Sequence, residues 1–219
     1  MAEMYLIRHA QASFGSANYD KLSELGHRQS RLLGEYFKAR DLNFEHVVTG
    51  DMQRHRETAL GIVGAEQALV TDPGWNEYDF QAVIDAYLRV HPEQKPIKNA
   101  PRSDWYRVLK AAMLSWSRQE LEGLDEYWSD FESRVSRAAQ SVFTSGKKRV
   151  LVVSSGGAIG VCLMQMLGVS VEKAIDFNLQ IKNTSIHHFY FNEKSAQLSS
   201  FNNVPHLDHP QHHHLISYS

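Results

Sequence analysis

The chain has 219 residues, of which 42% are hydrophobic and 22% charged, and its formal net charge is −2 at pH 7. This composition is ordinary for a soluble globular protein, and the charge excludes a broad electrostatic attraction to nucleic acid or to an anionic membrane. Cys162 is the one cysteine, so an intrachain disulfide framework is excluded. No segment approaches the roughly 20 apolar residues of a membrane span, and no signal peptide precedes the first predicted strand. We therefore expect a cytoplasmic protein.

The first predicted strand is a short apolar run, Tyr5 to Ile7, which ends at Arg8 and His9. A buried strand of this kind delivers two cationic groups at its carboxyl end. A surface Arg-His pair beside an edge strand would give the same pattern. The next segment, residues 12–20, is rich in Ser, Gly and Asn and predicts a loop.

A helix, a strand and a second helix are predicted next. The first helix runs from an N-cap at Ser23 to about Arg40, the strand covers residues 44–49, and Gly50 and Asp51 open the second helix. This alternation of strand and helix is typical of a layered α/β fold. Four side chains of the second helix are predicted to face inward: Met52, Ala59, Leu60 and Val63.

Residues 73–123 interrupt this alternation. They are rich in Trp, Tyr and charged residues, contain Pro92, Pro96 and Pro101, and predict a loop followed by irregular helices. We expect a single domain over residues 1–219, with a helical or irregular insertion at about 80–122 that lies over one end of the sheet. Its cationic residues could contact substrate or form a solvated helix face.

The rest of the chain returns to the α/β pattern. A helix over about 125–144 is predicted to carry Tyr127 on its apolar stripe, and the apolar run 150–153 is typical of a fully buried strand. The Ser-Ser-Gly-Gly sequence at 154–157 predicts a tight turn into a helix over 158–167. We therefore predict a three-layer α/β/α sandwich around a mostly parallel sheet. The last predicted elements are a short helix over 171–177 and strands over 185–191 and 197–201.

Polar residues follow three of the predicted strands. Arg8 and His9 follow the first, Arg54 the second, and residues 154–157 the strand at 150–153. In an open α/β sheet the ligand lies beyond the carboxyl ends of the strands. Two guanidinium groups and a turn with backbone N–H groups at a helix start predict a receptor for a phosphate dianion.

Several short motifs occur in a characteristic order: Arg8-His9-Ala10-Gln11, Thr49 to Arg54 with Thr58-Ala59, Trp75-Asn76-Glu77, Val152 to Gly157, and Asn183-Thr184-Ser185. This ordered set resembles the histidine phosphatase superfamily, which includes cofactor-dependent phosphoglycerate mutases and many phosphatases. The resemblance covers most of the chain and implies a phosphoglycerate mutase-like fold.

The resemblance also implies roles for individual residues. His9 would be the nucleophile and become a phosphohistidine, with its other ring nitrogen held by a backbone carbonyl. Arg8 and Arg54 would neutralise the phosphoryl oxygens, together with Ser155 and Gly156 as phosphate-binding residues. Glu77 would protonate the leaving alcohol and then activate water. Gln11, Ser13 and His55 are possible auxiliary residues of the same site.

The sequence departs from the family pattern at the position of its second histidine, which is Ser155 here. Loss of one preorganised donor commonly costs roughly 10²- to 10³-fold in rate. Ser155 can donate a hydrogen bond but brings no positive charge. His55 stands where the family usually has Ala and either compensates or is a surface residue, since adjacent helix positions do not face the same way.

Further departures lie in the segment after His9. Ala10 stands where the family has Gly, and Ala12 and Gly15 replace residues that line the pocket of the mutases. We expect substitutes for these pocket residues among three polar side chains, which are Ser13, Ser16 and Asn18. These changes favour a phosphatase over a mutase.

The resulting hypothesis is a phosphoric monoester hydrolase that acts on a small phosphorylated substrate without a cofactor or metal. One alternative is a weak or inactive family member that binds a phosphorylated ligand or protein, and a phosphoglycerate mutase is the third. The C-terminal histidines could bind a metal through His206, Asp208 and His209, although a solvated tail is the simpler interpretation. The sequence carries no indication of oligomeric state.

Overall fold

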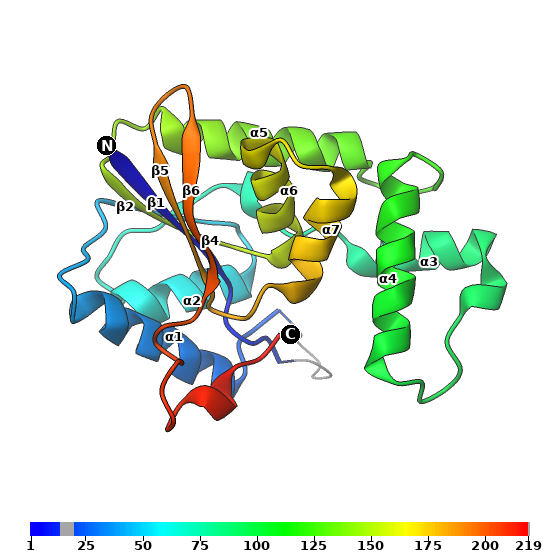
Figure 1. The fold of residues 1–219 in the computed structure, drawn as a ribbon, viewed down its shortest axis with the longest axis horizontal. Helices are drawn as coiled ribbons and strands as arrows, with labels where there is room; N and C mark the ends of the chain where they lie inside the picture. Colours follow the sequence, from blue (N-terminus) through cyan, green and yellow to red (C-terminus); the bar gives the residue numbers. More distant parts are fainter. Residues whose placement is uncertain (14–19, 219) are drawn as a thin grey trace.

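A six-stranded sheet forms the centre of the computed structural model, which describes residues 1–13 and 20–218 (Figure 1). The strand order is β3-β2-β4-β1-β5-β6, in which the first four strands pair in parallel and the pairs β1–β5 and β5–β6 are antiparallel. This confirms the mostly parallel sheet, and β3 is a two-residue edge strand that the sequence did not predict. The strands are β1 (Ala2–Arg8), β2 (His46–Thr49), β3 (Val70–Thr71), β4 (Arg149–Ser154), β5 (Ile186–Phe191) and β6 (Ala196–Asn203).

Helices cover both faces of the sheet and confirm the three-layer fold (Figure 1). Leu6 and Val152 pack into the core beneath α5 and α6, whereas Ile7 and Val153 pack into the core beneath α1 and α2. Successive residues of a strand point to opposite faces, which is why the central residues of β1 and β4, 4–7 and 150–153, are all apolar or aromatic. The helices of these layers are α1 (Glu24–Lys38), α2 (Gln53–Val63), α5 (Trp128–Phe143), α6 (Gly156–Leu167) and α7 (Val171–Gln180).

The segment predicted as an insertion forms two regular α-helices, α3 (Phe80–Val90) and α4 (Arg102–Ser117), so the expectation of irregular helices is wrong. Figure 1 shows both helices at one side of the molecule, beyond α7. An aromatic cluster joins them to α5, because the buried ring of Trp116 stacks on Phe131 with ring centroids 5.5 Å apart. Three short 3₁₀ turns complete the fold: η1 (Pro73–Trp75), η2 (Pro92–Gln94) and η3 (His213–Leu215).

Two predicted inward-facing side chains are exposed. Leu60 is 38% exposed and Tyr127 is 43% exposed. Tyr127 is the N-cap residue of α5 and therefore precedes its buried stripe. In α2 the buried face contains polar residues that an apolar-periodicity argument overlooks, and it consists of Arg54, His55, Thr58, Ala59 and Ile62.

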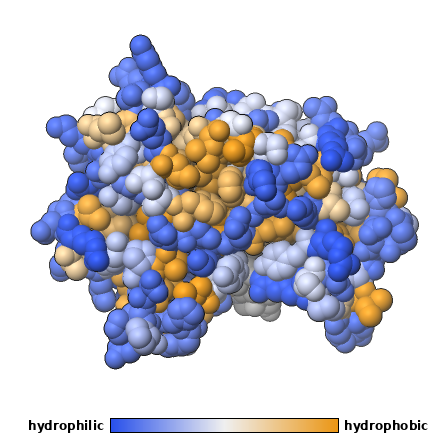
Figure 2. Space-filling model, in the orientation of Figure 1, coloured by the Kyte–Doolittle hydropathy of each residue, from blue (hydrophilic) through white to orange (hydrophobic). Residues whose placement is uncertain are grey.

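The surface in Figure 2 is mixed, with hydrophilic residues around an apolar area that lies over α6. Within residues 1–13 and 20–218, no helix combines the length and the apolar character needed to cross a bilayer. Gly15, Ser16 and Asn18, which were expected to affect the pocket, lie outside the described residues.

Candidate active site

The carboxyl ends of three adjacent strands bring the predicted site residues together. β4 lies between β1 and β2, with Arg8 opposite Ser154 and Thr49 opposite Val153. The backbone continues this register, since the His9 N–H donates to the carbonyl of Ser154 at 2.8 Å. His9, the first residues of α2 and the start of α6 therefore meet at one edge of the sheet, where parallel α/β sheets bind ligands.

His9 is held in one orientation and is 5% exposed. Its Nδ1 lies 2.7 Å from the carbonyl oxygen of Ala10, an acceptor only, so Nδ1 carries the ring proton of the neutral imidazole. The backbone is fixed as well, because Asn183 donates to the His9 carbonyl at 3.0 Å and the Ala10 N–H donates to Thr58 at 2.9 Å. Nε2 is therefore the nitrogen with the available lone pair.

The environment of His9 favours the neutral imidazole. Burial lowers its pKa well below the usual histidine value, and the charges of Arg54 and Arg8 and the neighbouring His55 lower it further. The hydrogen bond to Ala10 acts in the opposite direction but does not prevail. The ring is thus unprotonated at Nε2 near neutral pH, the state that a nucleophile requires.

Two guanidinium groups flank this imidazole. Arg54 is 6% exposed and its Nη1 donates to Oδ1 of Asp20 at 2.6 Å, while the backbone N–H of Gln53 donates to the other Asp20 oxygen at 2.8 Å. Arg8 donates through Nη1 to the carbonyl of Ile181. Their positive charges act on both His9 and Glu77, so the space between these groups suits a dianion.

Glu77 lies against the start of α6. Its Oε2 accepts from the Gly157 N–H at 3.1 Å, and its Oε1 accepts from the Tyr78 N–H at 3.3 Å. Burial raises the pKa of this carboxyl, although the Gly157 N–H, the two arginines and the Tyr78 N–H oppose the rise. Glu77 therefore holds its proton at higher pH than an exposed glutamate, which is the property of a general acid.

Substitution of Gly157 by alanine is expected to lower kcat by about 10²-fold, the cost of a small misplacement of a catalytic group. A Cβ at this position would lie 2.2 Å from Oε1 of Glu77 and 2.6 Å from the Tyr78 ring, so both must move. Steady-state kinetics with an aryl phosphate and with an alkyl phosphate measure the effect, with thermal unfolding as the control for folding. An unchanged kcat in a folded variant would refute this placement of Glu77.

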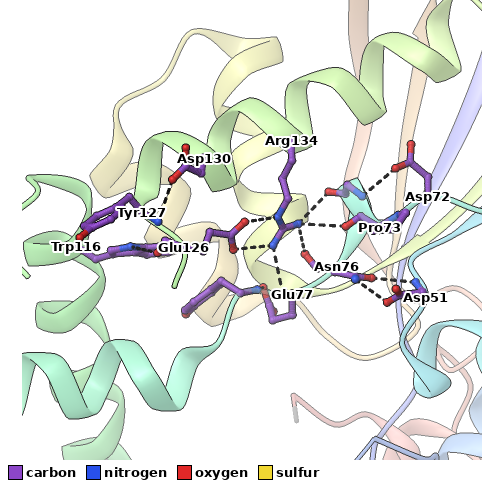
Figure 3. Close-up of polar contacts among 12 residues, drawn as sticks. Asp51, Asp72, Pro73, Asn76, Glu77, Trp116, Glu126, Tyr127, Asp130 and Arg134 are labelled. Carbon is purple, nitrogen blue, oxygen red and sulfur yellow. Dashed lines mark hydrogen bonds and ion pairs between the residues drawn. The ribbon is translucent and has the colours of Figure 1, made fainter. Parts of the chain in front are cut away.

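Arg134, which sequence reasoning missed, holds the segment that carries Glu77 (Figure 3). From α5 it forms a two-point ion pair with Glu126, at 2.5 and 3.0 Å. The same guanidinium donates to backbone carbonyls of the η1 segment, at 3.1 Å to Gly74, 2.7 Å to Asn76 and 3.4 Å to Glu77. The sequence does not distinguish an arginine on a solvated helix face from one that binds the carbonyls of a distant loop, because only the tertiary contacts differ.

Replacement of Arg134 by methionine is expected to lower kcat more than it raises KM, because it removes the donors to the η1 segment and loosens Glu77. The long apolar side chain of methionine keeps part of the packing. Arg137, one turn later on α5 and exposed, provides the control variant Arg137→Met. Equal kinetics for the two variants would exclude a positioning role for Arg134.

His55 and Ser155 form a buried hydrogen bond, with Nε2 2.7 Å from the Ser155 Oγ. The His55 ring also lies beside His9, with ring centroids 5.7 Å apart. His55 is therefore not a surface residue, although it follows Arg54 directly in α2. The side chains of Arg54 and His55 are both buried because the first turn of α2 lies against the end of the sheet.

The other auxiliary residues connect the loop after β1 to α1. Gln11 accepts from the Ser23 hydroxyl at 2.8 Å, and Ser13 donates to the carbonyl of Leu22 at 2.9 Å. Gly156 contributes backbone at the start of α6, where a Cβ would lie 2.4 Å from the Asn178 side chain. In the C-terminal region, His206 is buried and its Nε2 bonds to Thr184 at 2.9 Å. No group of three His, Cys, Asp or Glu side chains that could hold a metal occurs within the described ranges.

Comparison with known proteins identifies the family of the chain. The family model of the histidine phosphatase superfamily (branch 1) matches residues 4–204. A protein from Erwinia tasmaniensis named "Probable phosphoglycerate mutase" is 26% identical over 201 residues, which cover 85% of this chain and 83% of that protein.

Solved structures of phosphatases share the fold. A phosphoserine phosphatase from Entamoeba histolytica in complex with phosphoserine has a TM-score of 0.67 at 17% identity, covering 94% of this chain and 100% of the other. The α-ribazole phosphatase from Shigella flexneri has a TM-score of 0.66 at 19% identity, covering 92% of this chain and 96% of the other. These similarities confirm the predicted phosphoglycerate mutase-like fold.

Proposed function

Because the chain belongs to the histidine phosphatase superfamily (branch 1), we propose that it hydrolyses a phosphomonoester through a phosphohistidine at His9. The observation that carries this proposal is the fixed His9 ring, whose Nδ1 is bonded to Ala10 and whose pKa is lowered by the charges of Arg54 and Arg8. The same two charges act on the buried carboxyl of Glu77. These are the components that phosphoryl transfer to an imidazole requires.

In the first step, Nε2 of His9 attacks phosphorus and the bond from phosphorus to the leaving oxygen breaks. Glu77 gives its proton to that oxygen, so the product leaves as a neutral alcohol. Arg8 and Arg54 neutralise the charge that spreads over the equatorial oxygens, and the N-terminal end of α6 at Ser155 and Gly156 faces the same group.

In the second step, water attacks phosphorus from the side that the alcohol has vacated. The Glu77 carboxylate takes a proton from this water, the bond from phosphorus to Nε2 breaks, and phosphate is released. His9 returns to its neutral state and Glu77 to its protonated state. Neither step draws on a cofactor.

We further propose that the leaving group binds in a cavity of about 430 Å³ lined by Arg102, Tyr106, Leu179 and Tyr218. Two of its lining residues lie close in the chain to residues that bond to the site. Leu179 is two positions before Ile181, whose carbonyl accepts from Arg8, and Tyr218 follows Ser217, which donates to the Asn183 side chain that in turn donates to the His9 carbonyl. A guanidinium beside two phenol rings suits a small organic alcohol that also carries an anionic group. The substrate thus belongs to the class of small phosphorylated metabolites.

Two other functions are distinguished by one assay series. Ser155 favours a weak or inactive protein that binds a phosphorylated ligand, and the similarity to the Erwinia protein favours a phosphoglycerate mutase. We expect phosphate release from an aryl phosphate and from phosphoserine, and no interconversion of 3- and 2-phosphoglycerate by ³¹P NMR. Binding without phosphate release would support the first alternative, and interconversion the second.

A further inference from the structure

The Ser155–His55 pair has the construction of a functional unit. Both side chains are fully buried, and their 2.7 Å hydrogen bond joins the N-cap position of α6 to the first turn of α2. The two residues are 100 positions apart in the chain and meet beside His9, whose ring centroid is 5.7 Å from that of His55. A buried polar pair at this place requires an explanation, because two apolar residues would fill the space at lower cost.

The backbone is shaped to admit this imidazole. Gly50, at the end of β2, has no side chain, and a Cβ there would lie 2.3 Å from Nδ1 of His55 and 2.5 Å from the Asn76 side chain. Any other residue at position 50 would therefore displace the His55 ring. Gly50 does not have a positive φ, so its backbone conformation does not require glycine. The close approach of the His55 ring explains this glycine instead.

The protons of the His55–Ser155 hydrogen bond can be arranged in two ways. Nδ1 of His55 is buried and has no hydrogen-bond partner among the described residues. With the proton on Nδ1, Ser155 donates to Nε2 and the buried Nδ1–H has no partner among the described residues. With the proton on Nε2, His55 donates to Ser155 Oγ, and the donor left over is the Ser155 hydroxyl. Buried donors without partners are costly. The second arrangement satisfies every donor once a bound group accepts from Ser155, so in that state His55 donates and Ser155 Oγ accepts.

With its oxygen already accepting, Ser155 has a hydroxyl proton to give, and no acceptor for it is present in the part of the chain that the structure describes. We propose that this proton goes to an oxygen of the transferred phosphoryl group, so that His55 and Ser155 together supply the hydrogen bond that a single histidine supplies in relatives. Ser155 touches the substrate, and His55 is a positioning residue that acts through it. This inference rests on the proposed phosphatase function.

A double-mutant cycle tests the pair. Ser155→Ala is expected to lower kcat by roughly 10²-fold, the low end of the cost of one oxyanion donor. His55→Ala is expected to lower kcat less, and the double variant to be no slower than Ser155→Ala, because His55 acts only through Ser155. KM should change little. Effects that multiply in the double variant, or an unchanged kcat in Ser155→Ala, would overturn the proposal.

Orthovanadate gives a readout that a purely structural role would not affect, since it mimics the phosphoryl group in transfer. Its inhibition constant is expected to rise in Ser155→Ala and His55→Ala by about the factor by which kcat falls. The matched control is His187→Ala, which removes another buried imidazole bonded to a serine, Ser185, at 3.2 Å. This control should lower the melting temperature and leave vanadate inhibition unchanged. Equal weakening by all three variants would mean a general effect of lost packing.

Transfer of the histidine provides the reverse test. In the variant His55→Ala/Ser155→His, the space left by His55 accommodates a ring on residue 155, and we expect at least about tenfold higher kcat than in His55→Ala/Ser155→Ala. If His55→Ala/Ser155→His has no higher kcat than His55→Ala/Ser155→Ala, the proposal that the pair replaces a single histidine is contradicted. An acid-stable phosphoserine at Ser155 would overturn the proposal differently, by making Ser155 a nucleophile. If His9→Ala is inactive while these variants retain full kcat, only this inference fails and the proposed function stands.

Discussion

Replacement of His9 by alanine is expected to lower kcat by roughly 10⁴- to 10⁶-fold, the range in which removal of a covalent nucleophile falls in other enzymes. Among the described side chains at the site, only His9 has a backbone carbonyl that fixes the ring proton on one nitrogen and leaves a lone pair on the other. The measurement is phosphate release from an aryl phosphate, with wild-type and variant protein purified in parallel so that a contaminating phosphatase is recognised.

The His9→Ala variant should still bind phosphate esters, because Arg8, Arg54 and the start of α6 remain. Calorimetric titration with a slowly hydrolysed phosphomonoester is expected to give a dissociation constant close to the KM of the wild type. An active His9→Ala variant would contradict the phosphohistidine mechanism. A variant that is inactive and also fails to bind would indicate that the substitution has disrupted the pocket, which thermal unfolding would show.

Replacement of Glu77 by glutamine is expected to lower kcat for an alkyl phosphate by about 10²- to 10⁴-fold, the usual contribution of a general acid. For an aryl phosphate with a good leaving group the loss in the first step should be smaller, because a phenolate needs little protonation. Glutamine preserves the acceptor for the Gly157 N–H but cannot give a proton to the alcohol. Equal losses for both leaving groups would assign Glu77 to substrate binding instead.

The pH dependence provides a second readout for Glu77. The first step needs a protonated Glu77, and burial raises its pKa above that of an ordinary glutamate. Activity toward alkyl phosphates should therefore fall as the pH rises through this raised pKa. The first step also needs a neutral His9, whose pKa is lowered. At the acid end, activity should therefore fall only at a pH below the pKa of an ordinary histidine. Glu77→Gln should lose the decline at high pH and keep the decline at low pH.

The fold and the first residues of the site could be predicted because their signals are local. Runs such as 150–153 are apolar throughout because both faces of a parallel strand are covered. Arg8 and His9 follow such a run directly, so the position of the strand places them at the edge of the sheet. The backbone carbonyl that holds Nδ1 of His9 was expected from the resemblance to the family, and it belongs to the adjacent residue, Ala10.

The roles of Arg134, Asn183 and His55 could not be predicted because they depend on contacts distant in the chain. Arg134 contacts carbonyls about 60 positions earlier, and Asn183 reaches His9 across 174 positions. His55 illustrates the same limit. The argument that neighbouring helix positions face apart fails in the first turn of α2, where Arg54 and His55 are both buried. His55 bonds to Ser155 at the end of β4, and Arg54 pairs with Asp20.

The central claim is a covalent bond between phosphorus and Nε2 of His9, and trapping that intermediate tests it most directly. Enzyme mixed with a ³²P-labelled phosphomonoester and quenched in alkali within one turnover should carry label on the peptide that contains His9. The label should be lost in acid, as expected for a phosphorus–nitrogen bond, and absent from His9→Ala. Label that survives acid, or label on any other peptide, would contradict the account.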